Sequence, residues 1–133
     1  MKNTGAPSEQ QFEDLMLATY GKRVYLYRIE DAKAAYGLNN RAVKTNARPS
    51  DYIVTANGDM FYAEVKSTVS PTHAAFKLRK GQTVAITRQI AAGGKYYVFV
   101  HSIHHGKWYK LPFHEFKTVP TWRWHDLEQY RIT

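Results

Sequence analysis

The dipeptide Asn57-Gly58 lies between two short runs rich in aromatic and β-branched residues, at positions 52–55 and 60–66. Asn-Gly is a strong short-range indicator of a two-residue hairpin, because a type I′ turn requires positive φ at both central positions. If these two residues form the turn, the numbers of directly opposed residues sum to 115. Asp51 is then expected to face Glu64 across the two strands.

Two carboxylates opposed in this way repel each other unless one is protonated or a cation lies between them. Oxygen ligands of this kind suit a hard divalent cation. Lys66 follows Glu64 by two residues and is expected on the same face, whereas Phe61 and Val65 point to the opposite, apolar face. Alternating Glu and Lys residues are common on exposed strands, so the interpretation as a site depends on Asp51 and on the predicted register.

The remaining pattern predicts helices and strands around this hairpin. A helix is expected over 8–20, with Ser8 as its capping residue and Gly21 at its end. Strands are expected at 24–29, 96–101 and 108–111, with irregular stretches at 30–50 and 67–76. A second helix is expected over 78–92, stopped by Gly93-Gly94, with a buried side formed by Leu78, Ala85, Ile86 and Ile90.

This order of elements predicts an α/β fold with a central mixed sheet flanked by helices. A chain of 133 residues is expected to form one domain over 1–133, with a flexible terminus at 1–7 and an aromatic C-terminal tail at 117–133. The apolar runs are too short for a membrane helix, and the N-terminal residues do not resemble a signal peptide. There is no cysteine. We therefore expect a cytoplasmic protein.

The net charge of +8 and the pI near 9.7 favour a polyanionic partner such as nucleic acid. Charge alone does not distinguish an enzyme from a binding module.

The segment Pro49-Ser50-Asp51, followed after twelve residues by Glu64-Val65-Lys66-Ser67, resembles the PD-(D/E)XK nuclease superfamily. The interval, the Asn-Gly turn within it and the Ser after the Lys are most similar to Holliday-junction resolvases, both the archaeal Hjc type and the bacterial RecU type. The resemblance covers about residues 8–116, and Ser50 departs from the pattern by separating the Pro from the Asp. It implies a restriction-endonuclease-like core.

The resemblance also implies roles for particular residues. Asp51, Glu64 and the carbonyl of Val65 would bind Mg²⁺, with Mn²⁺ as a substitute, as one ion or as two. Lys66 would orient or deprotonate the attacking water, or stabilise the phosphate. Glu13, which follows Phe12, would be a direct or water-mediated ligand, or else a surface residue of the first helix. Gln82 would contact the water or a phosphate, or else be exposed.

Basic residues near the motif are candidate DNA contacts that position phosphates, although each is also interpretable as a solvated cation. They are Arg41, Lys44, Arg48, Lys77, Arg79 and Lys80. His101, His104 and His105 match no zinc pattern and are expected to face solvent in a turn.

The function predicted from these features is a metal-dependent endonuclease that resolves four-way DNA junctions, acting as a homodimer because such a junction has two-fold symmetry. A virus or mobile-element origin would suit so compact a resolvase. Two alternatives stay open: another PD-(D/E)XK nuclease, of restriction or repair type, and a non-catalytic nucleic-acid-binding module.

Overall fold

The computed structural model describes residues 5–29, 49–78, 80–112 and 121–133. Of the irregular stretch expected at 30–50, residues 30–48, with Arg41, Lys44 and Arg48, lie outside the described residues, as do Arg79 and Phe113. The elements, in chain order, are α1 (Gly5–Tyr20), η1 (Gly21–Arg23), β1 (Val24–Arg28), β2 (Tyr52–Ala56), β3 (Asp59–Thr68), β4 (His73–Ala75), α3 (Lys80–Ala91), β5 (Tyr96–Ser102), β6 (Lys107–Pro112), β7 (Thr121–Arg123) and η2 (Trp124–Tyr130).

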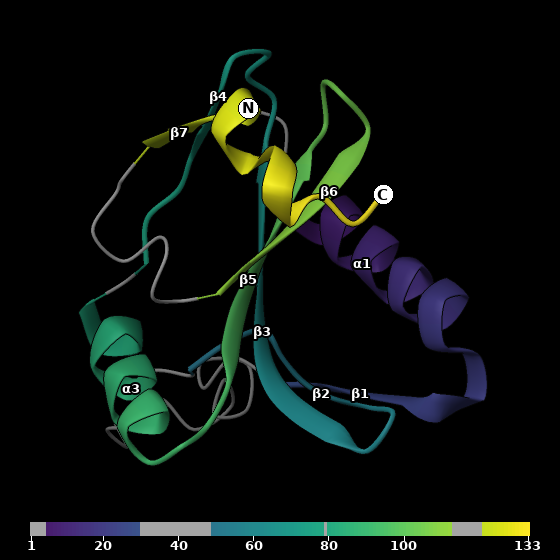
Figure 1. Cartoon of the computed structure of the whole chain (residues 1–133), viewed down its shortest axis with the longest axis vertical. Helices are drawn as coiled ribbons and strands as arrows, with labels where there is room; N and C mark the ends of the chain where they lie inside the picture. The colour runs from purple at the N-terminus through teal and green to yellow at the C-terminus, as the bar shows by residue number, and fades with distance from the viewer. Residues whose placement is uncertain (1–4, 30–48, 79, 113–120) are drawn as a thin grey trace, which may run out of the picture.

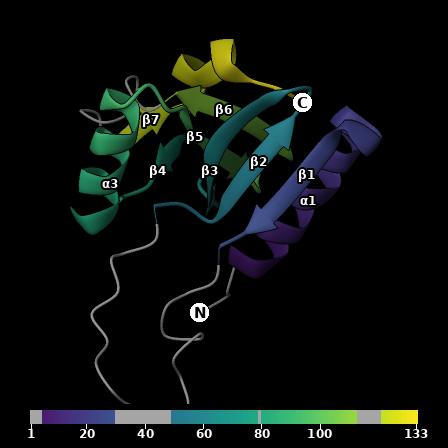
Figure 2. The same ribbon diagram turned by 90° about the horizontal axis from the view of Figure 1, so that it is seen from below.

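Five strands form the main sheet in the order β1-β2-β3-β5-β6. Strands β3 and β5 pair in parallel, and the other neighbours pair antiparallel. Helix α1 covers one face of the sheet, and α3 lies on the opposite face (Figure 1; Figure 2). The predicted α/β fold with a central mixed sheet is therefore confirmed.

The hairpin between β2 and β3 has the predicted turn and register. Asn57 has φ 53° and Gly58 has φ 80°, as a type I′ turn requires. The ladder runs from Ala56 opposite Asp59 to Tyr52 opposite Ala63. Every pair in it has numbers that sum to 115, so the alternation of side chains along both strands follows the predicted pattern.

Each face of the sheet carries a hydrophobic cluster. On the α1 side, Phe12 and Met16 pack against residues of the sheet such as Tyr52 and Phe99. On the other side, Ile86 of α3 and Leu127 of η2 belong to a second cluster. Strand β5 contributes alternate residues to both clusters, so it is the strand around which the two layers are built.

The N-terminal helix begins earlier than predicted, at Gly5, and Ser8 does not cap it. Pro7 is tolerated in the first turn because the N–H groups there have no partner within the helix. Ser8 is buried, and its Oγ lies 2.8 Å from Nδ1 of His101. The ring of His101 stacks on Trp108, so the expectation that this histidine faces solvent was wrong; His104 and His105 are exposed as expected.

The stretch at 67–76 is not wholly irregular, because it contains β4, which pairs with β7 in the C-terminal tail. The tail therefore belongs to the core. Trp124 donates from Nε1 to the carbonyl of Ser70 at 2.9 Å, and its ring stacks on Tyr109. The β4–β7 ladder and the hydrogen bond from Trp124 to Ser70 join segments about 50 residues apart, which local sequence patterns do not indicate.

The second helix starts at Lys80, two residues later than expected. Its buried side runs through Gln82 and Ile86, whereas Ile90 is 38% exposed. The prediction that Ile90 is buried was wrong: it follows Ile86 by four residues on the same side of the helix, but it lies at the C-terminal end of α3, where that side is open to solvent. No helix in the described ranges is long and apolar enough to span a membrane.

Replacing Leu127 with Ala should lower the free energy of unfolding by about 2–5 kcal/mol, since Leu127 is fully buried and truncation leaves a cavity. Urea denaturation of the wild type and the variant measures this difference. The exposed neighbour Gln129 supplies the control, Gln129→Ala, with an expected change below about 0.5 kcal/mol. Equal effects of the two substitutions would show that η2 is not part of the core.

Candidate active site

The carboxylate of Glu64 is buried on the α3 side of β3, with 4% of the residue exposed. Its Oε2 accepts a hydrogen bond from Nε2 of Gln82 at 3.0 Å and lies 3.3 Å from Nζ of Lys66. Its Oε1 is buried and accepts no hydrogen bond from any residue that the structure describes. A buried carboxylate oxygen without a partner is energetically costly, so this atom indicates that a further ligand belongs here.

The side chain of Asp51 lies beside Glu64, but it is not placed there by strand pairing as the predicted register implied. The ladder ends at Tyr52, so Asp51 is not a paired residue of β2. Its Oδ2 instead accepts a hydrogen bond from the backbone N–H of Val65 at 2.8 Å, and its carbonyl accepts one from Ile29 at 2.8 Å. The side chain thus takes the place of a backbone acceptor and lies against the strand beside Glu64.

Tyr96 supports the segment that carries Asp51. Its hydroxyl donates to the carbonyl of Pro49 at 2.7 Å, while Oγ of Ser50 donates to the carbonyl of Tyr52 at 2.7 Å. Burial, reinforced by the charges of Glu64 and Asp51, raises the pKa of Tyr96, so the hydroxyl stays a donor. Sequence reasoning missed this residue; the indication was a tyrosine at the start of a buried strand, whose hydroxyl needs a partner.

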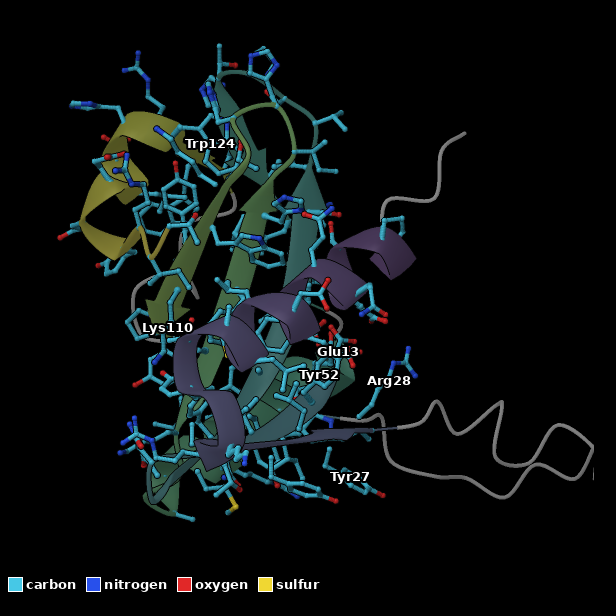
Figure 3. The ribbon with its side chains drawn as sticks, turned by 90° about the vertical axis from the view of Figure 1, so that its right-hand side faces the viewer. Glu13, Tyr27, Arg28, Tyr52, Lys110 and Trp124 are labelled. Atoms are coloured by element: carbon cyan, nitrogen blue, oxygen red, sulfur yellow. The ribbon has the colours of Figure 1, made fainter. Side chains whose placement is uncertain are left out.

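Glu13 lies on the other side of the sheet. Its Oε2 accepts a hydrogen bond from the hydroxyl of Tyr52 at 2.7 Å, and Figure 3 shows the two side chains together beside α1. Burial and this hydrogen bond raise the pKa of Tyr52. Glu9 and Arg28 form an ion pair of 3.0 Å on the same side. The role of Glu13 as a direct or water-mediated metal ligand stays a prediction.

The donor set fits a hard divalent cation. Among the described residues, no three Asp, Glu or His side chains gather closely enough to hold a metal by themselves. Mg²⁺, however, commonly binds through one or two carboxylates and completes its shell with water and substrate phosphate oxygens. Asp51 and Glu64 supply two adjacent carboxylates, and Oε1 of Glu64 is buried without a hydrogen bond to the described part of the chain.

The structure therefore brings together five predicted residues: Asp51, Glu64, Val65, Lys66 and Gln82. Gln82 is 1% exposed, so its interpretation as an exposed helix residue was wrong. Lys77, which precedes α3, and Lys80, its first residue, are exposed, and their contacts with DNA stay a prediction.

No protein-family model matches the chain, and no curated protein is significantly similar to it in sequence. Among solved structures it is similar to Hjc from Archaeoglobus fulgidus, described as a Holliday junction resolvase from an archaeal hyperthermophile. The TM-score is 0.55, the sequence identity is 16%, and the match covers 92% of this chain and 91% of the other. The chain thus has the fold of an archaeal Hjc, as the sequence resemblance predicted.

Mg²⁺ should stabilise the wild-type protein, because a ligand that binds only the folded state adds to the free energy of unfolding. The gain should be about 2.7 kcal/mol at a concentration 100 times Kd. Thermal melting in Mg²⁺ and in EDTA measures this gain as a shift in Tm. The shift should be lost in Glu64→Gln. It should be retained in Asp14→Asn, a substitution on the exposed surface of α1. A shift of equal size in Glu64→Gln would place the ion elsewhere.

Replacing Tyr96 with Phe should weaken Mg²⁺ binding by up to about 10-fold, the lower end of the range for partners bonded directly to a metal ligand, because Tyr96 holds the backbone two residues before Asp51. The substitution removes the donor to Pro49 and leaves the Asp51 segment less firmly held. Calorimetric titration measures the affinity. Tyr97→Phe is the matched control, since the neighbouring side chain packs on the α1 side of the sheet. Unchanged affinity in Tyr96→Phe would exclude the positioning role.

Proposed function

We propose that the protein is a metal-dependent, structure-selective DNA endonuclease whose preferred substrate is a four-way junction. The observation that carries this proposal is the buried Glu64, which lies beside Asp51 and has one oxygen with no hydrogen-bond partner in residues 5–29, 49–78, 80–112 and 121–133. Such a pair is costly as a structural feature alone and is useful as a cation site. The basic charge of the chain and its likeness in fold to a resolvase support the same conclusion.

In this proposal Asp51 and Glu64 hold Mg²⁺, with the carbonyl of Val65 as a further ligand. The ion would activate water for attack on the phosphodiester and stabilise the leaving oxygen. Gln82 fixes the orientation of Glu64 through the hydrogen bond to Oε2. Lys66 is the mobile cation of the site: its side chain is 27% exposed, so its ammonium group can turn from Glu64 to the attacking water or to the phosphate.

Glu13 acts through water or through Tyr52, the residue that follows Asp51. Lys77, which precedes α3, and Lys80, its first residue, are exposed and would contact phosphates that flank the scissile bond. Two copies of the chain would place two such sites on one junction, so the proposal includes a homodimer that makes paired cuts.

The test is cleavage of a labelled four-way junction and of a linear duplex of the same sequence, in Mg²⁺, in Mn²⁺ and in EDTA. We expect symmetric nicks in the junction that require the metal and that fall at least about 100-fold in Asp51→Asn, since one carboxylate ligand is lost. Asp14→Asn is the matched control and should cleave like the wild type.

Equal cleavage of the linear duplex would support a nuclease but contradict the preference for junctions. This result would favour a restriction-like or repair nuclease. Tight binding of the junction without cleavage in either metal would contradict the enzymatic proposal and favour a binding module.

A further inference from the structure

Part of the sheet face that carries the carboxylates is open to solvent. The register places two rows of side chains across β1, β2 and β3 on this face: Tyr27, Ile53 and Tyr62 in one row, and Tyr25, Thr55 and Met60 in the next. Tyr25 is 64% exposed, Tyr27 53% and Met60 62%. Large apolar side chains grouped on an exposed face indicate a binding surface.

This surface, which we call the tyrosine platform (Tyr25, Tyr27 and Met60), adjoins the candidate active site. Tyr62 lies two residues along β3 from Glu64 and on the same face, and Ile53 of β2 lies two residues after Asp51. Two residues of a strand span about 7 Å, roughly two stacked base steps of DNA. Figure 3 shows Tyr27 on the opposite side of β1 from Glu13 and Tyr52, which belong to the α1 side.

A groove of about 260 Å³ continues the platform towards the end of α3. Ile53, Met60 and Tyr62 contribute an apolar side, and Gln89 contributes an amide. Lys95 at the rim is paired with Asp59 at 2.8 Å. An apolar floor with an amide at its edge suits a nucleobase, whose flat face stacks and whose edge forms hydrogen bonds.

We propose that the tyrosine platform stacks against unpaired bases of the DNA strand whose phosphate lies at Asp51 and Glu64. The inference rests on the proposed function and adds the means by which the site selects branched DNA. Fully paired bases are stacked on one another and cannot reach Tyr27, whereas bases near a branch point can leave the stack. Stacking on tyrosine is also independent of sequence, as structure selectivity requires.

The position of the platform favours DNA over a second copy of the chain as its occupant. A stable protein interface covers about 800 Å² on each partner. An interface of that size centred on Tyr27 would extend over the row that carries Asp51 and Glu64, only about 7 Å away. It would then close the site to its substrate, whereas a DNA strand occupies both places at once. The net charge of +8 favours the same polyanion.

The experiment measures binding without cleavage, using Ca²⁺ in place of Mg²⁺ and a four-way junction with 2-aminopurine at the branch point. Stacking on a tyrosine quenches this fluorophore. We expect Tyr27→Val to raise Kd about 10-fold and to abolish the quenching, because base stacking on an aromatic ring contributes about 1–3 kcal/mol. Tyr27→Phe, which keeps the ring, should bind within about twofold of the wild type.

Two controls separate the possible outcomes. Leu17→Ala removes an equally exposed apolar side chain on α1 and should leave Kd unchanged. Sedimentation of wild type and Tyr27→Val without DNA should give the same mass; a smaller mass for the variant would show that the face joins two copies and would overturn the inference.

Wild-type affinity and quenching in Tyr27→Val would also overturn the inference while leaving metal-dependent cleavage untouched. The wild-type protein could also bind the junction without cleaving any DNA. If Tyr27→Val then lowered the affinity, the role of the tyrosine platform would be supported and the proposed enzymatic function would be contradicted.

Discussion

The hydrogen bond from the backbone N–H of Val65 to the carboxylate of Asp51 is the interaction on which the site depends. At this point the β2–β3 ladder has ended, and a backbone donor of β3 would otherwise face no acceptor. The side chain of Asp51 satisfies it and is thereby fixed beside Glu64. The backbone at Pro49 is held by the hydroxyl of Tyr96, outside the ladder. The carboxylate of Asp51 nevertheless remains bonded to β3 through the N–H of Val65.

The local part of this arrangement follows from the sequence. Asn57 and Gly58 adopt positive φ, which few other residue pairs tolerate, and the turn then determines every pair of the hairpin. The predicted register located only part of the candidate site. Alternation along the strands predicted the shared face of Glu64 and Lys66, but the geometry at Asp51 depends on where the ladder ends, which the turn does not determine.

Contacts between distant segments account for most of what the sequence did not indicate. Ser8 matches a capping residue in its local pattern, yet it is buried against His101, 93 residues away. The sequence around Gln82 is typical of the exposed side of a polar helix. In the structure α3 packs against β3, and Gln82 donates a hydrogen bond to Glu64. In both cases a polar side chain is buried because tertiary packing supplies a partner, and helical periodicity carries no information about that partner.

The two faces of the β2–β3 hairpin have different roles: one packs in the core, and the other carries the candidate site. On the α1 side, Val54, Phe61 and Ala63 are buried in an apolar cluster that holds the hairpin in place. On the other side, the same strands carry Glu64 and the row that includes Ile53 and Tyr62. Because alternate residues serve the two purposes, substitutions on the open face leave the packing against α1 intact. A strand pair built in this way is held by its packing on the α1 side, so the exposed residues beside Glu64 can vary without displacing the carboxylate.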